Sequence, residues 1–149
     1  MGIEDIVTAV NRLIVAEWPE RPVYRDFLKK DFERPSFFLE VKKTTTEPLN
    51  AHLLREKHVI AAVIFEAVDE SGAADNVRLL ETQERFQRLF SSGKLKVGDR
   101  YLNISVSAPN VDIDSAIVDL TVDYYRTRTD ERDETPPIRT VETRLETEV

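Results

Sequence analysis

Hydrophobic and polar positions follow two different periods along the chain, and these periods predict its helices and strands. Residues 2–17 place apolar side chains at helical spacing with acids in the first turn, so we expect an amphipathic helix that ends before Pro19. A second helix is expected to begin at a cap formed by Asp75 or Asn76 and to be closed by Gly93. The apolar faces consist of Ile3, Ile6, Val7, Val10, Leu13 and Ile14 in the first helix and of Leu79, Leu80, Phe86, Leu89 and Phe90 in the second.

Alternation with a period of two predicts the strands. Val23-Tyr24 is expected to be a short strand, and residues 36–43, 102–107 and 116–125 are expected to be longer ones. Helices and strands in this order predict an α+β fold, in which an antiparallel or mixed sheet has two main helices packed on one face. The core-facing strand residues are expected to be Phe37, Leu39, Val41, Leu102, Ile104, Val106, Ala116, Val118, Leu120, Val122 and Tyr124.

The least globular pattern of the domain lies between residues 42 and 58. Residues 53–68 resemble one long strand that is polar on both faces at first and apolar on both faces from Val59 to Phe65. Such a strand has to leave the domain partway along. We therefore expect residues 42–58 to form a projecting β-hairpin, called the arm below, with residues 44–50 as its turn-rich connection. A helix over residues 51–58 is the competing interpretation.

The composition changes near residue 126. Residues 127–149 are rich in threonine, arginine and acids and contain few apolar side chains, so they cannot bury enough surface to fold alone. We expect a single α+β domain over residues 1–126, followed by a flexible, charged, threonine-rich C-terminal tail over residues 127–149. The tail is either a solvated end or a strap that orders on a neighbouring subunit through Ile138, Val141 and Leu145.

Length, charge and cysteine content limit the kinds of partner and site that the chain can have. The chain has 149 residues, enough for one domain with a substantial core. A net charge of -7 without a segregated basic patch makes nucleic acid an unfavourable partner. The absence of cysteine excludes disulfides and thiolate metal sites. No apolar run approaches the ~20 residues of a membrane span, so we expect a soluble protein made inside a cell.

The sequence contains no recognisable catalytic motif. His52 and His58 are six residues apart, which suits neither a helical nor an extended metal site, and both are expected to be exposed on the arm. Asp112 and Asp114 could share one side of an extended segment and bind a hard cation, but no glycine provides the turn of a calcium loop. We therefore predict no enzyme, no catalytic or metal-binding residue and no cofactor.

The order of these features resembles a known family, the small tail terminator (tail-completion) proteins of tailed bacteriophages and prophages. The similarity covers roughly residues 3–126 and rests on patterns of hydrophobic and aromatic residues, without an invariant motif. It is carried by Asp5-Ile6-Val7 with Leu13, by Pro22-Val23-Tyr24, by the Phe32–Leu39 entry into a strand, by Val59–Phe65 and by Val118–Tyr125.

The resemblance implies a structural virion component. Members form α+β subunits that assemble into a ring, usually a hexamer, on the last layer of the tail tube. The ring stops tube polymerisation and presents a surface for head attachment. The implied partners are other copies of this chain, the tail tube protein and a head-tail connector or neck protein, with neither nucleic acid nor membrane. The implied location is the head-proximal end of the tail, after synthesis in the host cytoplasm.

Candidate interface residues follow from the resemblance to tail terminator proteins. A threonine-rich segment suits strand pairing between subunits, and arm cations suit charge contacts. The alternatives are a monomeric α+β module that binds a protein or ligand, or another phage neck component. A ring protein needs the arm to project, whereas a compact module should fold it back. The predicted subunit or tube interface consists of Thr44, Thr45, Thr46, Arg55, Lys57, Ile138, Val141 and Leu145.

Overall fold

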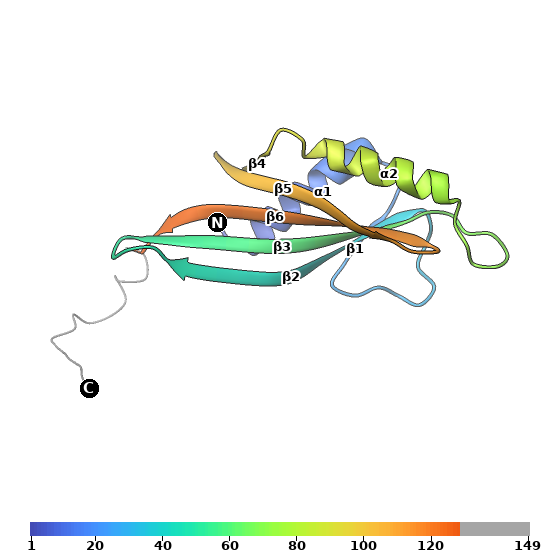
Figure 1. The fold of residues 1–149 in the computed structure, drawn as a ribbon, viewed down its shortest axis with the longest axis horizontal. Helices are drawn as coiled ribbons and strands as arrows, with labels where there is room; N and C mark the ends of the chain where they lie inside the picture. The colour runs from blue at the N-terminus through green and yellow to red at the C-terminus, as the bar shows by residue number, and fades with distance from the viewer. Residues whose placement is uncertain (129–149) are drawn as a thin grey trace, which may run out of the picture.

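The computed structural model describes residues 1–128, which form a six-stranded sheet with two helices on one face (Figure 1). The strand order is β1-β2-β3-β6-β5-β4, and only β1 and β2 pair in parallel. The predicted α+β class with a mixed sheet is confirmed. The elements are α1 (Ile3–Glu17), β1 (Val23–Arg25), β2 (Ser36–Pro48), β3 (Leu53–Phe65), α2 (Asn76–Leu89), β4 (Lys94–Val97), β5 (Arg100–Val111) and β6 (Ser115–Thr127).

Both helices begin and end where local chemistry favours it. The Asp5 carboxylate accepts a hydrogen bond from the Gly2 N–H at 3.0 Å, at the positive end of the α1 dipole. The Asp75 carboxylate caps α2 by accepting from the Val77 N–H at 3.0 Å. Gly93 follows the end of α2 with a φ of 78°, a conformation that glycine adopts without strain.

The core lies between the two helices and the sheet. Trp18 at the end of α1, Phe37 on β2 and Phe86 on α2 form an aromatic cluster, with ring centroids 4.8 to 6.0 Å apart. Leu80 is 46% exposed and Leu13 is also exposed, so the predicted apolar faces of the helices were too wide. The core residues from the central strands are Ile60, Ala62, Ile64, Ala116, Val118, Leu120, Val122 and Tyr124.

Two strand predictions need correction. Val41 was expected in the core but is 40% exposed, because it lies where β2 leaves the helix-covered part of the sheet. β4 was not predicted, because its four residues are too short to show a clear alternation. The alternation of β6 is confirmed over its whole predicted length, with every second residue from Ala116 to Tyr124 buried.

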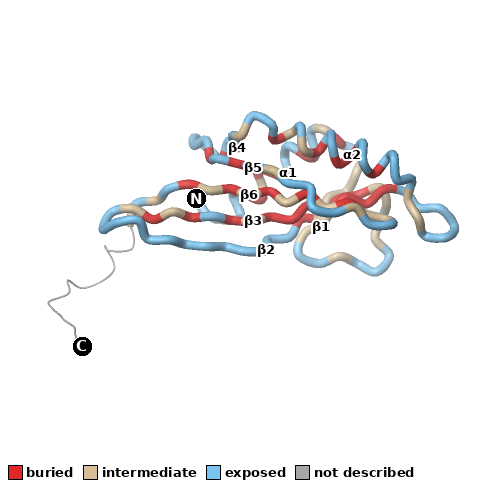
Figure 2. Tube along the Cα trace, in the orientation of Figure 1, coloured by how far each residue is buried: buried red, intermediate tan, exposed pale blue. Residues whose placement is uncertain are grey.

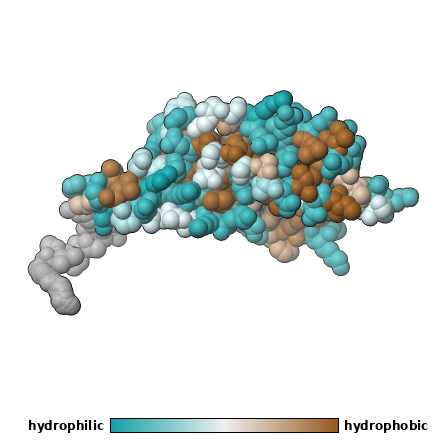
Figure 3. Space-filling model, in the orientation of Figure 1, coloured by the Kyte–Doolittle hydropathy of each residue, from teal (hydrophilic) through white to brown (hydrophobic). Residues whose placement is uncertain are grey.

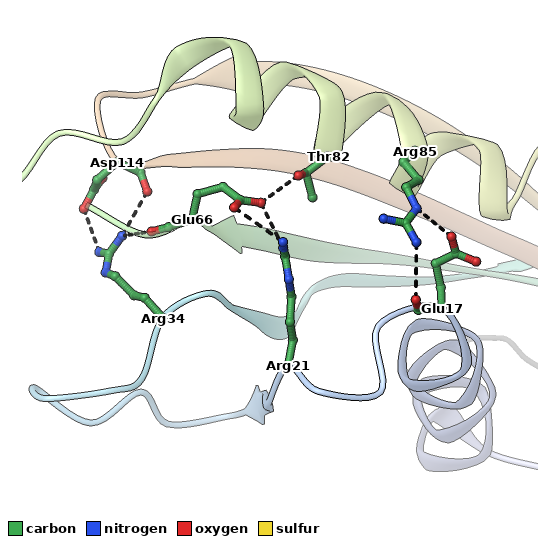
Figure 4. Close-up of polar contacts among 7 residues, drawn as sticks. All are labelled: Glu17, Arg21, Arg34, Glu66, Thr82, Arg85 and Asp114. Atoms are coloured by element: carbon green, nitrogen blue, oxygen red, sulfur yellow. Dashed lines mark hydrogen bonds and ion pairs between the residues drawn. The ribbon is translucent and has the colours of Figure 1, made fainter. Parts of the chain in front are cut away.

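A buried cluster of polar side chains connects the segment between α1 and β2, which includes β1, to the rest of the domain (Figure 4). The Glu66 carboxylate is only 1% exposed, and it accepts hydrogen bonds from Arg21 at 2.8 Å and from the Thr82 hydroxyl at 2.6 Å. Arg34 donates to the Glu66 carbonyl at 3.1 Å and to the Asp114 carboxylate at 2.9 Å. These contacts join the segment to the ends of β3 and β6 and to α2.

One of the two acids that the sequence offered as ligands for a hard cation belongs to this polar cluster. Asp114 is paired with Arg34, while the Asp112 carboxylate accepts a hydrogen bond from the Ile113 N–H at 2.9 Å. Within residues 1–128, no group of three or more histidines and acids is arranged to hold a metal ion. None of the helices in this part of the chain is long and apolar enough to cross a membrane.

Candidate assembly interface

The arm forms the end of the sheet that extends beyond the helices (Figure 1). β2 continues to Pro48 and β3 begins at Leu53, so the turn comprises only residues 49–52. The prediction of a turn over residues 44–50 was wrong, because the β-branched threonines continue the strand. The competing helix over residues 51–58 was also wrong, since residues 51 and 52 lie in the turn and Leu54 to His58 pair with strands on both sides.

The arm is accompanied by a third strand along its whole length. β6 pairs with β3 without a break, from Phe65 opposite Ser115 to Leu53 opposite Thr127. The predicted hairpin is therefore the outer part of a three-stranded extension. This third strand stiffens the arm, because an isolated two-stranded hairpin is only marginally stable in water.

One face of the arm is buried, contrary to the prediction that both faces are solvated. Leu54, Glu56 and His58 lie on this face, and His58 is only 3% exposed instead of exposed as expected. The prediction failed because it treated ionisable side chains as solvated. Tyr124 and Arg126 on the neighbouring β6 provide partners that a reading of β3 alone could not identify.

Thr44, His58, Tyr124 and Glu56 form a hydrogen-bonded chain across the three strands β2, β3 and β6. The Thr44 hydroxyl lies 3.0 Å from His58 Nδ1, and the Tyr124 hydroxyl lies 3.3 Å from His58 Nε2. The Tyr124 hydroxyl also donates to the Glu56 carboxylate at 3.3 Å, and Arg126 pairs with that carboxylate at 2.6 Å. The interior of the arm is thus held together by polar contacts.

Burial perturbs the ionisation of this chain. Burial lowers the pKa of His58 below 6.5, and the nearby Glu56 carboxylate opposes this change without outweighing it. Burial is also the largest cause of the raised pKa of Tyr124, with further contributions from Glu56. Both shifts favour the uncharged forms, in which imidazole and phenol can exchange hydrogen bonds as neutral partners.

The opposite face of the arm carries exposed charge. Arg55 pairs with Asp123 on β6 at 2.8 Å, and this hydrogen bond raises the pKa of the guanidinium. Lys57 forms no ion pair among residues 1–128. A hollow of about 490 Å³ lies here, and its lining consists of Lys43, Thr45, Thr46, Glu47, Pro48, Arg55, Lys57 and Val59.

The outer side of β2 is an open sheet edge. β1 pairs with β2 only from Phe37 to Leu39, so residues 40–48 have no strand on that side within the described part of the chain. All nine of these residues are exposed (Figure 2). A bulge between Val41 and Lys43, two lysines and Pro48 are features that natural edges use against uncontrolled pairing. These features limit unspecific pairing along this edge.

The other end of the molecule has a different surface. Figure 3 shows hydrophobic side chains at several places on this face, with the most at the end of the sheet opposite the arm and a smaller group at the arm end. Large apolar residues are exposed at the end opposite the arm on the loop after β3, on the first half of α2 and on the β5–β6 turn. They are Val68, Val77, Leu80 and Ile113. The arm thus carries the open edge together with exposed apolar residues such as Leu49 and Tyr125, and the opposite end carries a larger group of exposed apolar side chains.

The predicted interface residues divide into three groups. Thr44, Thr45 and Thr46 lie on the open edge, although Thr44 also contacts His58. Arg55 and Lys57 line the hollow on the exposed face. The tail residues Ile138, Val141 and Leu145 lie outside the described residues.

Sequence reasoning missed the open edge and the buried His58. The edge depends on which strands pair, which a single sequence does not state. A signal for His58 was present, because it continues the buried alternation of Ile60, Ala62 and Ile64 toward the turn.

Comparison with known proteins identifies the family. The family described as phage tail terminator protein matches residues 5–136, which is most of the chain. The chain therefore belongs to the phage tail terminator protein family, as its resemblance predicted. This family is structural and not enzymatic, and membership implies interactions with the tail tube and neck and a place in the virion tail. No curated protein matches the chain.

Proposed function

We propose that this tail terminator acts as a ring, with six copies expected, that caps the tail tube, stops its polymerisation and provides the surface for head joining. The observation that carries the proposal is the family match over residues 5–136. In the virion, the ring would occupy the head-proximal end of the tail. Its contacts would be with other copies of this chain, the tube protein and a connector or neck protein.

The arm supports this proposal. A subunit of a ring has to contact a neighbour on each side, and a sheet edge with free backbone groups is suited to such a contact. Thr44, Thr45 and Thr46 would contribute the edge, while Arg55 and Lys57 would contribute charge contacts on the adjoining face. Ile138, Val141 and Leu145 would act as a strap between subunits.

The two unlike ends of the molecule suit a ring as well. Rings of more than two copies use heterologous contacts, in which one surface binds a different surface on the next copy. The arm with its open edge and the exposed apolar residues at the opposite end are two such surfaces on one subunit. An isologous dimer would need only one self-complementary surface.

Electron microscopy of the cognate tube protein tests the capping function. The tube protein is polymerised with and without the terminator, and tube lengths and tube ends are measured. Shorter tubes with a discrete cap at one end are expected. Tubes of unchanged length without caps would contradict the proposal. A variant with Arg55→Glu and Lys57→Glu, compared with Lys29→Glu and Lys30→Glu, tests whether the arm is required.

A further inference from the structure

We propose that the open edge of β2 binds the C-terminal segment of its own chain, residues 138–149, as an antiparallel strand in the free subunit. The surface is the edge over residues 40–48, which is exposed and has no strand neighbour among residues 1–128 on that side. This proposal concerns the isolated subunit and does not depend on ring formation. Residues 138–149 lie beyond the end of the family match at residue 136.

The first argument is the position at which the described chain ends. The Arg128 N–H donates to the His52 carbonyl at 2.8 Å, and the Arg128 guanidinium donates to the Asn50 carbonyl at 2.9 Å. The described chain therefore ends directly beside the β2–β3 turn. To occupy the outer side of β2, the residues that follow have to cross three strand spacings, about 14 Å.

The second argument is length. Residues 129–137 are nine residues and can span up to ~30 Å when extended, which is ample for the crossing. Residues 138–149 cover ~40 Å as a strand, and the open edge of nine residues covers ~30 Å. A chain that returns from the turn along β2 runs antiparallel to it.

The third argument is the side-chain pattern. From residue 141 onward, odd-numbered positions hold valine, leucine or threonine, and even-numbered positions hold glutamate or arginine. This alternation is typical of a strand with one apolar face. The apolar face would continue the His58 face of the arm, where Thr44 and Val41 lie. The charged face would continue the face that carries Lys43 and Lys57.

Charge favours this pairing. The proposed strand, residues 138–149, carries three glutamates and two arginines, and the connecting residues 129–137 carry four more carboxylates and one arginine. The edge carries Lys42 and Lys43, and Lys57 lies beside it on β3 without an ion pair among the described residues. A segment with this excess of carboxylates is attracted to these ammonium groups. Pairing would also cover the backbone groups that make an open edge prone to aggregation.

Residue-resolved amide exchange of the full-length chain, at a concentration where it is monomeric, tests the pairing. Half of the amides of residues 42–47 point away from β3, and pairing should slow their exchange at least about tenfold relative to unprotected rates. Leu145→Pro should abolish this protection, since proline removes a donor within the added strand. Thr135→Pro, outside the pairing segment, should leave it unchanged. Unprotected amides in the unaltered chain would overturn the proposal.

Cysteine pairs determine which copy supplies the strand, because the natural chain has no cysteine to interfere. Thr44→Cys should form a disulfide with Thr143→Cys or Thr147→Cys, which lie on the same predicted face. Thr45→Cys, on the opposite face, should not form one with either. A disulfide within one chain supports the proposal. Disulfides only between chains, or none, would overturn it.

These experiments use no tube protein, so their outcome is separate from that of the capping assay. If capping fails while the edge amides are protected, only the proposed function is lost. If capping succeeds and the amides are unprotected, only the strand pairing is lost. The strap of the proposed ring would be this same strand transferred to the edge of a neighbour.

Discussion

The two halves of the sheet are built from different interactions. The half beneath α1 and α2 is closed by apolar packing, with Trp18, Phe37 and Phe86 at its centre. The arm has no helix layer, and its interior is a hydrogen-bonded chain that includes His58 and Tyr124. Apolar packing supplies most folding free energy, whereas polar contacts contribute little net stability but define geometry. The helix-covered half therefore supplies most of the stability of the fold, whereas polar contacts define the geometry of the arm.

The largest loss of stability is expected from a substitution in the core of the helix-covered half. Phe37→Ala is expected to lower the free energy of unfolding by about 3–5 kcal/mol, because it leaves a cavity in the aromatic cluster. Urea denaturation followed by tryptophan fluorescence measures this change. Phe27→Ala is the control, since Phe27 is 73% exposed, and it should change stability by less than ~0.5 kcal/mol. Equal effects at the two positions would contradict the comparison.

The second-largest loss of stability is expected from the buried polar cluster around Glu66. Arg21→Met removes the partner of the buried Glu66 carboxylate and is expected to cost about 3 kcal/mol. Adding Glu66→Gln to that variant should restore part of the stability, since no buried charge is then left unpaired. Arg88→Met breaks the exposed pair with Glu84 and should cost less than ~1 kcal/mol. Denaturation midpoints of the four proteins test this order.

Acidification should affect the arm through His58. Because burial lowers the pKa of His58 in the folded state, the unfolded chain binds a proton more readily below pH 6.5. Stability should therefore fall as pH decreases through 6.5 toward the folded pKa. His58→Gln should reduce this dependence while leaving that of the other groups in place. Urea denaturation between pH 7.5 and 5.5 compares the two proteins, and equal pH dependence would show that His58 does not contribute.

The smallest effect on stability should come from the exposed face of the arm. Reversing Arg55 and Lys57 to glutamate is expected to change the free energy of unfolding by less than ~1 kcal/mol. The same change should weaken self-association at low salt, where exposed charges act most strongly. Reversing Lys29 and Lys30 is the matched control. Sedimentation at two salt concentrations measures association, and unchanged association would exclude the charged face from the subunit contact.

The sequence was most informative where one side-chain pattern determines one surface. The alternation from Ala116 to Tyr124 predicted a half-buried strand, and the structure confirms it. The N-terminal helix and its end before Pro19 were predicted from spacing and backbone sterics alone. The prediction failed for His58, where an ionisable residue is buried by partners on a strand 66 residues away. It also failed for Val41, whose exposure depends on how far the helices extend over the sheet.

By itself, the sequence determined the helices, the main strands, the α+β class and the family, because these depend on local periodicity and on residue patterns. The tertiary structure alone decided that β6 accompanies the arm, that His58 is buried and that residues 40–48 form an open edge. Each of these features depends on which distant strands become neighbours. Pairing between strands is a long-range outcome, since hydrogen bonds between backbones are the same for every residue except proline.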